Sequence, residues 1–146
     1  MSSHKATVTW ERNGADFSLA SYSRDHRWDF EGGESLGASA APGYKGNPEL
    51  VDPEQAFVAS LSSCHMLTFL YLAAAKKLVI NRYVDESEGF LGKNEQGKMF
   101  VERVVMRPRV EFEGDAPDQA TLDQLHHGAH ANCFIANSVT TRIDIE

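Results

Sequence analysis

The sequence predicts an α+β fold, in which helices and strands occupy separate stretches of the chain. Segments with alternating apolar and polar residues, a pattern typical of strands, lie in the first 30 residues and again in the second half. Between them, a long apolar segment predicts a helix, and a second helix is expected before a C-terminal strand. We find no internal repeat, linker or low-complexity tract.

The length and composition predict one folded domain over residues 1–146. Domains cluster at about 100 to 150 residues, so we expect no second independent core in this 146-residue chain. Its 42% hydrophobic and 24% charged residues are typical of a globular protein rather than a disordered or fibrous one.

The acidic balance argues against a nucleic-acid partner. The net charge is -7 and the pI is near 5.3, whereas nucleic-acid binders collect Lys and Arg into a basic patch. Residues Met1–Trp10 lack the apolar core of a signal peptide, and we expect no apolar run near the ~20 residues that cross a bilayer. The expected location is therefore the cytoplasm, without a membrane partner.

The N-terminal region predicts a hairpin followed by a third strand and a loop. Alternation over Lys5–Glu11 and Asp16–Tyr22 indicates two strands, joined by a tight turn at Asn13–Gly14. His26–Phe30 is the third extended segment. Ser35–Asp52, rich in Gly, Ala, Ser and Pro and without periodicity, predicts a long loop of the kind that is usually functional or mobile.

A strong helix start follows this loop. Asp52 suits the N-cap, Pro53 the first helical position, and Gln55 stands three residues after the cap. We expect the helix to run to about Lys77. Because Phe57–Ala75 is apolar on nearly every face, this helix should lie at the centre of the fold or in a subunit interface.

Two further strands are expected after the helix. Val79–Glu88 and Met99–Phe112 have strand character, with a turn around residues 93–97 between them. Pro108 cannot donate a backbone hydrogen bond, so it is expected at a sheet edge or a bulge.

The C-terminal part predicts a second helix and a last strand. The helix should begin at Asp115–Pro117 and bury a face that carries Leu122, Leu125 and Ala129. Val139–Ile145 is expected to close the chain as a strand.

The two cysteines, Cys64 and Cys133, are the main candidates for chemistry. They match neither a zinc pattern nor the disulfide framework of a secreted domain, so in a reducing compartment they are either inert or reactive. A reactive cysteine must be a thiolate, and in mid-helix Cys64 needs a nearby cation. Arg24, Arg27 and His65 are the candidates, although a histidine next to Cys64 on the helix is more often a packing or hydrogen-bonded residue.

Glu54 precedes Cys64 by ten residues, close to three helical turns. The two residues share a face but lie about 15 Å apart along the axis, so they cannot touch directly. An arginine held bidentately by Glu54 could couple them. Alternatively, Glu54 is only a favourable carboxylate in the first turn.

A histidine-rich segment before Cys133 suggests a metal site as an alternative. On a helix, His126, His130 and Cys133 would share a face at spacings of four and three. However, no fourth ligand is nearby, and Gly128 suggests a fraying helix end. Solvated histidines at a helix terminus are the commoner outcome.

Two segments resemble the cysteine motifs of the OsmC/Ohr family. Residues 52–66, DPEQAFVASLSSCHM, are similar to the first motif, a Pro-Glu-(Glu or Gln) opening before the helix that carries the nucleophile. Residues 130–137, HANCFIAN, are similar to the second motif, although Phe134 stands where the family often has proline. The resemblance extends to element order over almost the whole chain. It implies antiparallel sheets wrapped around a long central helix in an intertwined homodimer.

The resemblance also implies roles for individual residues. Cys64 would be the peroxidatic thiolate and Cys133 the resolving thiol. Glu54 would orient an essential arginine from the N-terminal strands, for which Arg24 is the first choice and Arg27 the second.

The function that the resemblance implies is a thiol peroxidase. It would reduce organic hydroperoxides, or hydrogen peroxide, through a Cys64–Cys133 disulfide that an external dithiol then reduces. No cofactor is needed: neither haem, flavin nor metal. A non-catalytic dimeric binding protein and a His/Cys metal-binding protein are the alternatives.

Overall fold

The computed structural model describes all residues, 1–146, and has the predicted α+β character. The chain divides into two compact units, Met1–Ala56 and Phe57–Glu146. Helix α1 (Pro53–Ala75) begins in the first unit and continues in the second. The expectation of a single domain stays a prediction, and each unit is described by itself.

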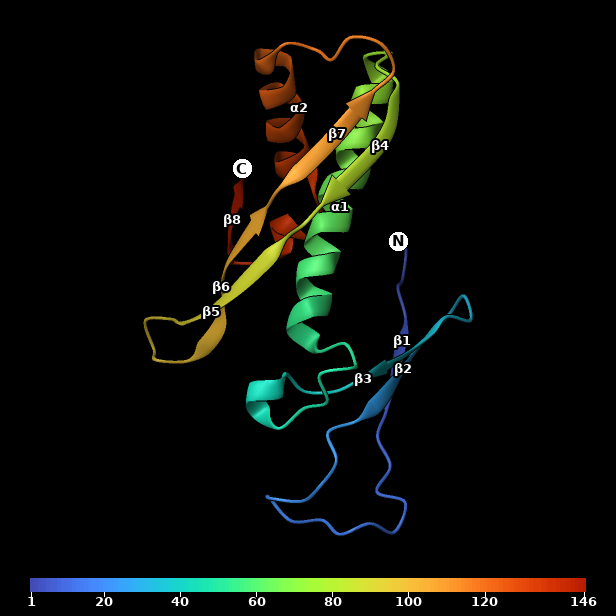
Figure 1. The fold of residues 1–146 in the computed structure, drawn as a ribbon, viewed down its shortest axis with the longest axis vertical. Helices are drawn as coiled ribbons and strands as arrows, with labels where there is room; N and C mark the ends of the chain where they lie inside the picture. The colour runs from blue at the N-terminus through green and yellow to red at the C-terminus, as the bar shows by residue number, and fades with distance from the viewer. The chain divides into compact units, whose positions relative to one another are not determined.

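The first unit contains a three-stranded antiparallel sheet in the order β1-β2-β3 (Figure 1). The strands are β1 (Ala6–Thr9), β2 (His26–Phe30) and β3 (Ser35–Ala38). The bounds of β2 are those predicted from the sequence. β3 was not predicted: it occupies the first residues of the segment expected to be a loop.

The predicted N-terminal hairpin is wrong. Asn13–Gly14 does form a turn with positive φ angles of 52° and 76°, but Asp16–Tyr22 is not a strand, and β1 pairs with β2 instead. The apolar residues of this segment pack on one another rather than on a sheet. Phe17 lies with its ring centroid 5.6 Å from that of Trp10 and 5.3 Å from that of Tyr22. This aromatic contact accounts for the alternation that resembled a strand.

The rest of the predicted loop is held by internal hydrogen bonds. Ser39 is buried, its backbone N–H donates to the carbonyl of Val51 (2.8 Å), and its hydroxyl accepts from the N–H of Asn47 (3.0 Å). A short 3-10 helix, η1 (Pro42–Tyr44), lies within it. The loop therefore returns to the start of α1 along a defined path.

The predicted start of α1 is confirmed. The Gln55 N–H donates to Asp52 Oδ1 (2.8 Å), and the Asp52 N–H donates to Gln55 Oε1 (3.0 Å), a reciprocal capping box. The helix ends at Ala75, two residues before the predicted Lys77, which has a left-handed φ of 61°.

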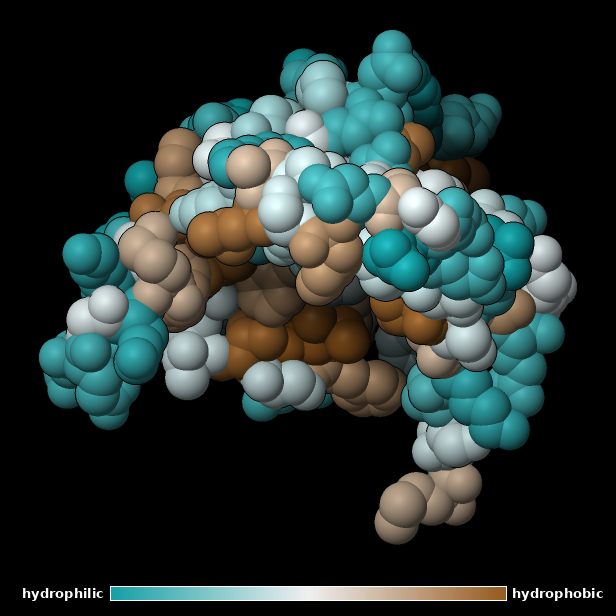
Figure 2. All heavy atoms as spheres, turned by 90° about the horizontal axis from the view of Figure 1, so that it is seen from below, coloured by the Kyte–Doolittle hydropathy of each residue, from teal (hydrophilic) through white to brown (hydrophobic).

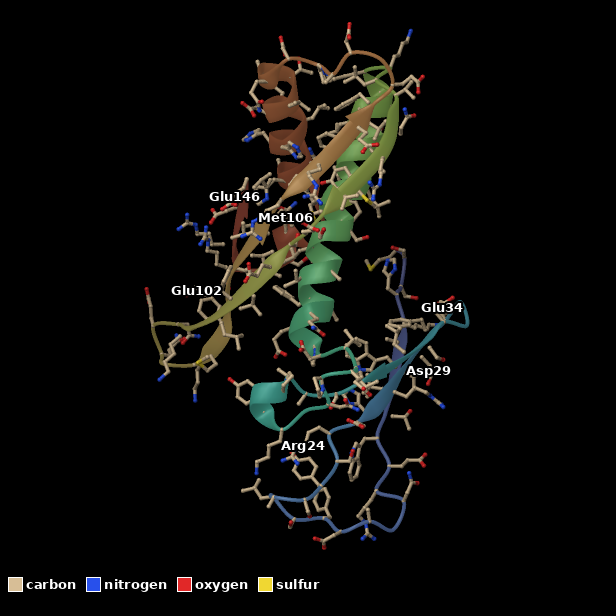
Figure 3. All side chains as sticks on the ribbon, viewed as in Figure 1. Arg24, Asp29, Glu34, Glu102, Met106 and Glu146 are labelled. Carbon is tan, nitrogen blue, oxygen red and sulfur yellow. The ribbon has the colours of Figure 1, made fainter.

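The second unit contains two further sheets. An antiparallel pair joins β4 (Ile80–Asp85) to β7 (Pro108–Phe112). A three-stranded sheet has the order β5-β6-β8, with β5 (Glu88–Lys93), β6 (Met99–Met106) and β8 (Arg142–Ile145). β6 and β8 run parallel, and the Glu146 N–H donates to the Met106 carbonyl (2.9 Å) where they end (Figure 3).

Two strand predictions in this unit need correction. Within Val79–Glu88, β4 covers Ile80–Asp85 and Glu88 opens β5, and Met99–Phe112 is broken at Arg107 into β6 and β7. The Arg107 N–H leaves the ladder and donates to Asp85 Oδ1 (2.6 Å), which explains the break. β5 was not predicted, because its glycines weaken strand propensity. Pro108 opens β7 in a two-stranded sheet, where both strands are edges, as expected.

Helix α2 (Gln119–Asn132) begins later than predicted. Its N-cap is Asp118, whose Oδ1 accepts from the Thr121 N–H (2.9 Å), rather than a residue of Asp115–Pro117. The predicted buried face is confirmed, since Leu125 and Ala129 are buried. A 3-10 helix, η2 (Ala136–Ser138), connects α2 to β8.

Two apolar cores lie in the second unit. The first joins α1, α2, β4 and β7, and the second joins α1, β6, η2 and β8. In Figure 1, α2 and the β4–β7 pair lie against the C-terminal part of α1. The buried members of the first core are Phe69, Ala73, Leu125 and Ala129. Those of the second are Leu61, Val104 and Met106.

Helix α1 is apolar all round but is covered on one face. Leu61, His65, Phe69 and Ala73, at spacings of four, are buried, whereas Leu67 and Tyr71 are 61% and 73% exposed. Apolar residues reach the surface in several places on the face that Figure 2 shows.

Contrary to our expectation, α1 has the length and apolar composition to cross a membrane. A core helix of a folded protein can meet the same criteria, and one face of α1 packs against the rest of the second unit. Two of its polar side chains bond to other elements: Ser62 to Asp85 of β4, and His65 to His126 of α2.

Candidate active site

The two cysteines come together from opposite ends of the second unit's sequence. Cys64 lies in the middle of α1 and is partly buried, and Cys133, the C-cap of α2, is 1% exposed. Both are free thiols. Burial raises the pKa of the Cys133 thiol, and the neighbouring Cys64 side chain raises it further. The two sulfur atoms are therefore neighbours, as a disulfide requires.

The backbone around Cys133 fixes its sulfur. The Ala136 N–H, at the start of η2, donates to Cys133 Sγ (3.3 Å). The chain also folds back on itself here, because the Asn137 N–H donates to the Cys133 carbonyl (3.0 Å). Phe134, which stands where the resembling motif often has proline, is 83% exposed and leaves this tight turn intact.

A histidine pair, of which His65 is buried and His126 partly buried, connects the same two helices. His65 Nε2 and His126 Nδ1 are 3.0 Å apart, and the rings are stacked with centroids 5.3 Å apart and an angle of 8° between their planes. Burial, together with the neighbouring His126 and His130, lowers the pKa of His65 to about 4, although the charge of Asp85 opposes the shift. Burial also lowers the pKa of His126. Both rings are therefore neutral at pH 7, so one donates and the other accepts.

Asp85 gathers polar groups at the end of β4. Its carboxylate accepts hydrogen bonds from the Ser62 and Ser87 hydroxyls and from the Arg107 N–H. Nearby, the Tyr83 hydroxyl is buried without a hydrogen-bond partner. Burial raises the pKa of Tyr83, and the charge of Asp85 raises it further.

The histidine-rich segment agrees only in part with its sequence interpretations. No group of three or more His, Cys, Asp or Glu side chains is arranged to hold a metal ion. His126 is not solvated at a helix end but is bonded to His65, while His127 and His130 are exposed. Gly128 does not fray the helix, which continues to Asn132. A Cβ there would lie 2.9 Å from Leu72 Cδ1, so glycine permits close helix packing.

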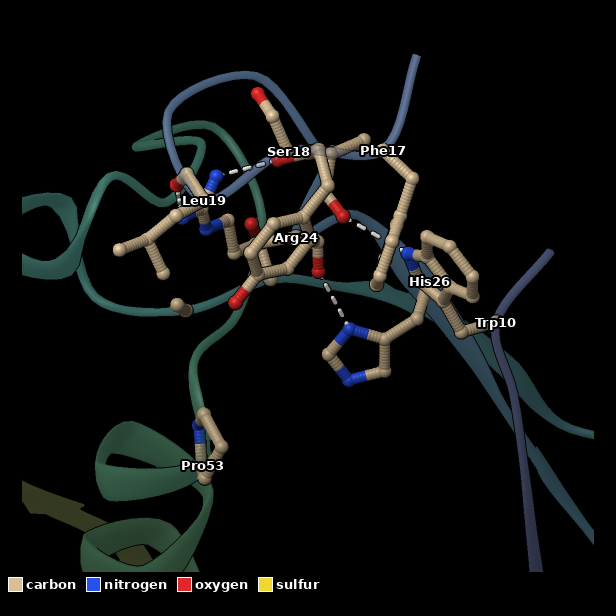
Figure 4. A pocket seen from close by; sticks show the side chains of 11 residues that line it. Trp10, Phe17, Ser18, Leu19, Arg24, His26 and Pro53 are labelled. Carbon is tan, nitrogen blue, oxygen red and sulfur yellow. Dashed lines mark hydrogen bonds between the residues drawn. The ribbon is translucent and has the colours of Figure 1, made fainter. Parts of the chain in front are cut away.

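A pocket of about 620 Å³ lies in the first unit, and its walls are mostly apolar (Figure 4). The loop between β1 and β2 supplies most of them. The Trp10 indole N–H donates to the Ser23 carbonyl (2.8 Å), which closes this loop. The lining residues include Trp10, Phe17, Leu19, Tyr22, Arg24 and Pro53.

Arg24 lines this pocket and is held by its own loop. Its guanidinium donates to the carbonyls of Tyr22 and Leu19 and lies 3.6 Å from the Tyr22 ring centroid. Arg27 is bonded instead to Asp29 (2.9 Å) on the exposed sheet. Glu54 stands in the first turn of α1 but forms no ion pair, so its expected pairing with an arginine is absent from this structure.

Sequence reasoning missed the pocket walls and the histidine pair. The aromatic residues of the pocket were assigned to a strand. A signal for the pair was present, since His65 falls at spacing four between Leu61 and Phe69, and His126 lies beside Leu125 on the apolar face of α2.

The whole chain is similar to solved OsmC-like structures. An OsmC-like protein of unknown function from Vibrio cholerae is 48% identical, with 100% of this chain and 99% of that chain covered and a TM-score of 0.95. An organic hydroperoxide resistance protein from Legionella pneumophila is 19% identical, with coverage of 100% and 95% and a TM-score of 0.71.

A third structure extends this likeness. An organic hydroperoxide resistance protein from Vibrio cholerae, with captopril bound in one of its active sites, is 22% identical, with coverage of 100% and 90% and a TM-score of 0.72. At such identities the likeness establishes the fold alone. No curated protein is similar enough to count as a match.

The family comparison covers both cysteines and Glu54, but not Arg24. The family model described as OsmC, OsmC-like protein, matches residues 46–146, more than two thirds of the chain. With the 48% identity to the Vibrio cholerae protein, this match establishes that the chain belongs to the OsmC-like protein family.

Proposed function

We propose that this protein is a thiol peroxidase that reduces organic hydroperoxides. The observation that carries the proposal is the pairing of Cys64 with Cys133, a partly exposed sulfur beside a buried one. Organic hydroperoxide resistance proteins with the same fold favour a peroxide substrate.

The two thiols suit different steps. Because its pKa is raised, Cys133 keeps its proton and can donate a hydrogen bond to Cys64. Cys64, the more exposed sulfur, attacks the O–O bond of the peroxide as a thiolate. The sulfur becomes a sulfenic acid, and the leaving alkoxide takes a proton to become an alcohol.

Cys133 then completes the oxidation. Its thiol condenses with the Cys64 sulfenic acid, which forms the disulfide and releases water. An external dithiol reduces this disulfide by exchange and is itself oxidised, in keeping with a reducing compartment such as the cytoplasm. The net reaction turns one hydroperoxide and one dithiol into an alcohol, a disulfide and water.

Arg24 is the proposed cation of the site, and Glu54 the proposed carboxylate that orients it. Arg24 stays charged at all relevant pH values and lines an apolar pocket large enough for an organic peroxide. Arg27 is the weaker choice, because Asp29 already neutralises it.

A homodimer is the proposed assembly. Leu67 and Tyr71 on α1 and Phe134 after α2 are large apolar side chains left exposed in one chain. A second copy would cover such a surface. Light scattering should give a mass twice the 16.2 kDa of the chain, and a monomer at micromolar concentration would contradict the assembly.

The function is tested by following peroxide consumption with a dithiol as electron donor. The wild-type protein should consume cumene hydroperoxide in repeated turnovers. Cys64→Ser should reduce the rate to that of the dithiol alone. Cys133→Ser should consume one equivalent of peroxide rapidly and then continue only as fast as the dithiol reduces the Cys64 sulfenic acid directly. Unchanged consumption in Cys64→Ser would refute the peroxidase.

A non-catalytic binding protein is the second candidate, because the apolar pocket of the first unit could hold a ligand without chemistry. In that case Cys64→Ser would leave ligand binding unchanged, and no hydroperoxide would be consumed by either protein. The structure gives no such support to a metal-binding function.

A further inference from the structure

The His65–His126 pair spans the same two helices as the cysteine pair. His65 follows Cys64 directly on α1, and His126 precedes Cys133 by seven residues, two turns of α2. The two histidines are joined by a single 3.0 Å hydrogen bond within the apolar core, where Phe69 packs on His126 with ring centroids 4.5 Å apart. No step of the peroxidase chemistry uses either ring.

Breaking the His65–His126 hydrogen bond without a movement of the helices would destabilise the protein. His65 is 1% exposed, so its Nε2 atom has no access to water as a replacement partner. A buried polar atom without a partner destabilises the state that contains it. If this hydrogen bond is lost, moving the two helices apart lowers the free energy, because water can then reach the Nε2 atom of His65.

A movement of α2 away from α1 would also move the two sulfur atoms relative to each other. Gly128 packs against Leu72, where a Cβ would lie 2.9 Å from the Leu72 Cδ1 atom, so α2 and α1 are in close contact at this turn. Cys133 terminates the same helix, and its sulfur is buried with Cys64 as a neighbour. A change in how α2 docks therefore changes the approach of Cys133 to Cys64.

We propose that the His65–His126 hydrogen bond is a positioning device that holds α2 on α1 so that Cys133 stays within bonding reach of Cys64. The two histidines are positioning residues and take no part in the chemical steps. This inference deepens the proposed function and rests on it for its biological purpose. The quantity that the histidine pair is proposed to raise is the effective concentration of the Cys133 thiol at the Cys64 thiol.

The test compares two substitutions of His126, one that keeps a ring and one that keeps a polar atom. His126→Phe keeps a ring to stack between His65 and Phe69 but replaces Nδ1 with carbon. His126→Asn keeps a polar atom at the position of Nδ1 but removes the rest of the ring. His127→Ala changes the exposed neighbouring histidine on the same helix and is the matched control.

The readout is the Cys64–Cys133 disulfide at equilibrium with glutathione buffers, measured by mass spectrometry of alkylated protein at pH 7. No peroxide is needed. His126→Phe should lower the effective concentration of the thiol pair about tenfold, the effect of leaving one buried hydrogen-bonding group unpaired. His126→Asn should recover most of that loss, and His127→Ala should match the wild type.

Thermal unfolding of the reduced variants separates positioning from general stability. A wild-type disulfide equilibrium in His126→Phe, whatever its melting temperature, would overturn the inference. Equal losses in His126→Phe and His126→Asn would also overturn it, because ring packing and not the hydrogen bond would then be responsible.

The proposed function can fail separately. If the wild type does not form the disulfide with peroxide but shows the predicted differences in glutathione, the peroxidase is wrong and the positioning role stands.

Discussion

The two units of the chain hold their functional side chains in different ways. Nine of the ten buried apolar residues lie in Phe57–Glu146, and only Ala38 lies in Met1–Ala56. The cysteines and the histidine pair are fixed by packed helices between two cores. The pocket and Arg24 are instead built from a loop closed by backbone hydrogen bonds and aromatic contacts. The placement of Cys64 relative to Cys133 thus depends on core packing, whereas the proposed peroxide contacts depend on a loop.

Core truncation should produce the largest effect and should separate the two units. Phe69→Ala removes a fully buried ring that contacts Tyr83 and His126, so it should lower the free energy of unfolding by about 3 to 5 kcal/mol. Leu19→Ala, in the exposed loop at the pocket, should change it by less than about 0.5 kcal/mol while raising the KM for cumene hydroperoxide. Urea unfolding and steady-state kinetics measure both. Equal decreases in the free energy of unfolding for Phe69→Ala and Leu19→Ala would contradict the difference between the two units.

Removing the loop arginine should affect activity without affecting the core. Arg24→Ala should reduce peroxide consumption by about 10- to 100-fold, the range expected for losing one charged hydrogen-bonding group at a reacting sulfur. Arg27→Ala is the matched control, because Arg27 is an exposed residue bonded to Asp29. If Arg27→Ala has the larger effect on kcat/KM, the assignment of the two arginines is reversed.

Acid should weaken the second unit through its buried histidines. The pKa of His65 is lowered to about 4 from an ordinary value near 6.5, so below pH 6.5 the unfolded chain binds a proton that the folded chain does not. Stability should therefore be unaffected above pH 6.5 and should fall as pH drops from 6.5 toward 4. His126 and His130 on α2 and Asp85 on β4 are the charged or titratable groups that act on His65.

The pH dependence is measured by urea unfolding at a series of pH values. His65→Gln should flatten the curve between pH 6.5 and 4, and His127→Ala should leave it as in the wild type. An identical slope in His65→Gln and the wild type would contradict a buried neutral His65.

The smallest expected effect concerns Tyr83. Its hydroxyl is buried without a partner, so Tyr83→Phe removes an unsatisfied polar atom and keeps the ring packed on Phe69. The free energy of unfolding should stay the same or rise by up to about 1 kcal/mol. A decrease of more than about 1 kcal/mol in the free energy of unfolding would mean that the Tyr83 hydroxyl forms a hydrogen bond in solution.

Local signals predicted the parts of the fold that local chemistry determines. The capping box at Asp52 and Gln55 and the strand His26–Phe30 were correct, because neighbouring residues alone specify them. The strand predicted at Asp16–Tyr22 was wrong, because its aromatic residues pack within a loop. Long-range contacts cannot be identified from alternation in one segment.

The candidate site depended more heavily on resemblance than on pattern. Nothing in a separation of 69 residues indicates that Cys64 and Cys133 meet; the motifs suggested it, and the packing of α2 on α1 brings them together. The roles of Arg24 and Glu54 stay predictions. His126 was expected in solvent because histidines at a helix end usually are, but its place on the apolar face of α2 buries it against His65.

The central claim is that one thiol attacks peroxide and its neighbour traps the product. Intact-protein mass spectrometry after one equivalent of cumene hydroperoxide tests it most directly. We expect a loss of two hydrogens per chain, with Cys64 and Cys133 joined in one disulfide-linked peptide pair. Two free thiols after treatment with cumene hydroperoxide, and again with hydrogen peroxide, would contradict it.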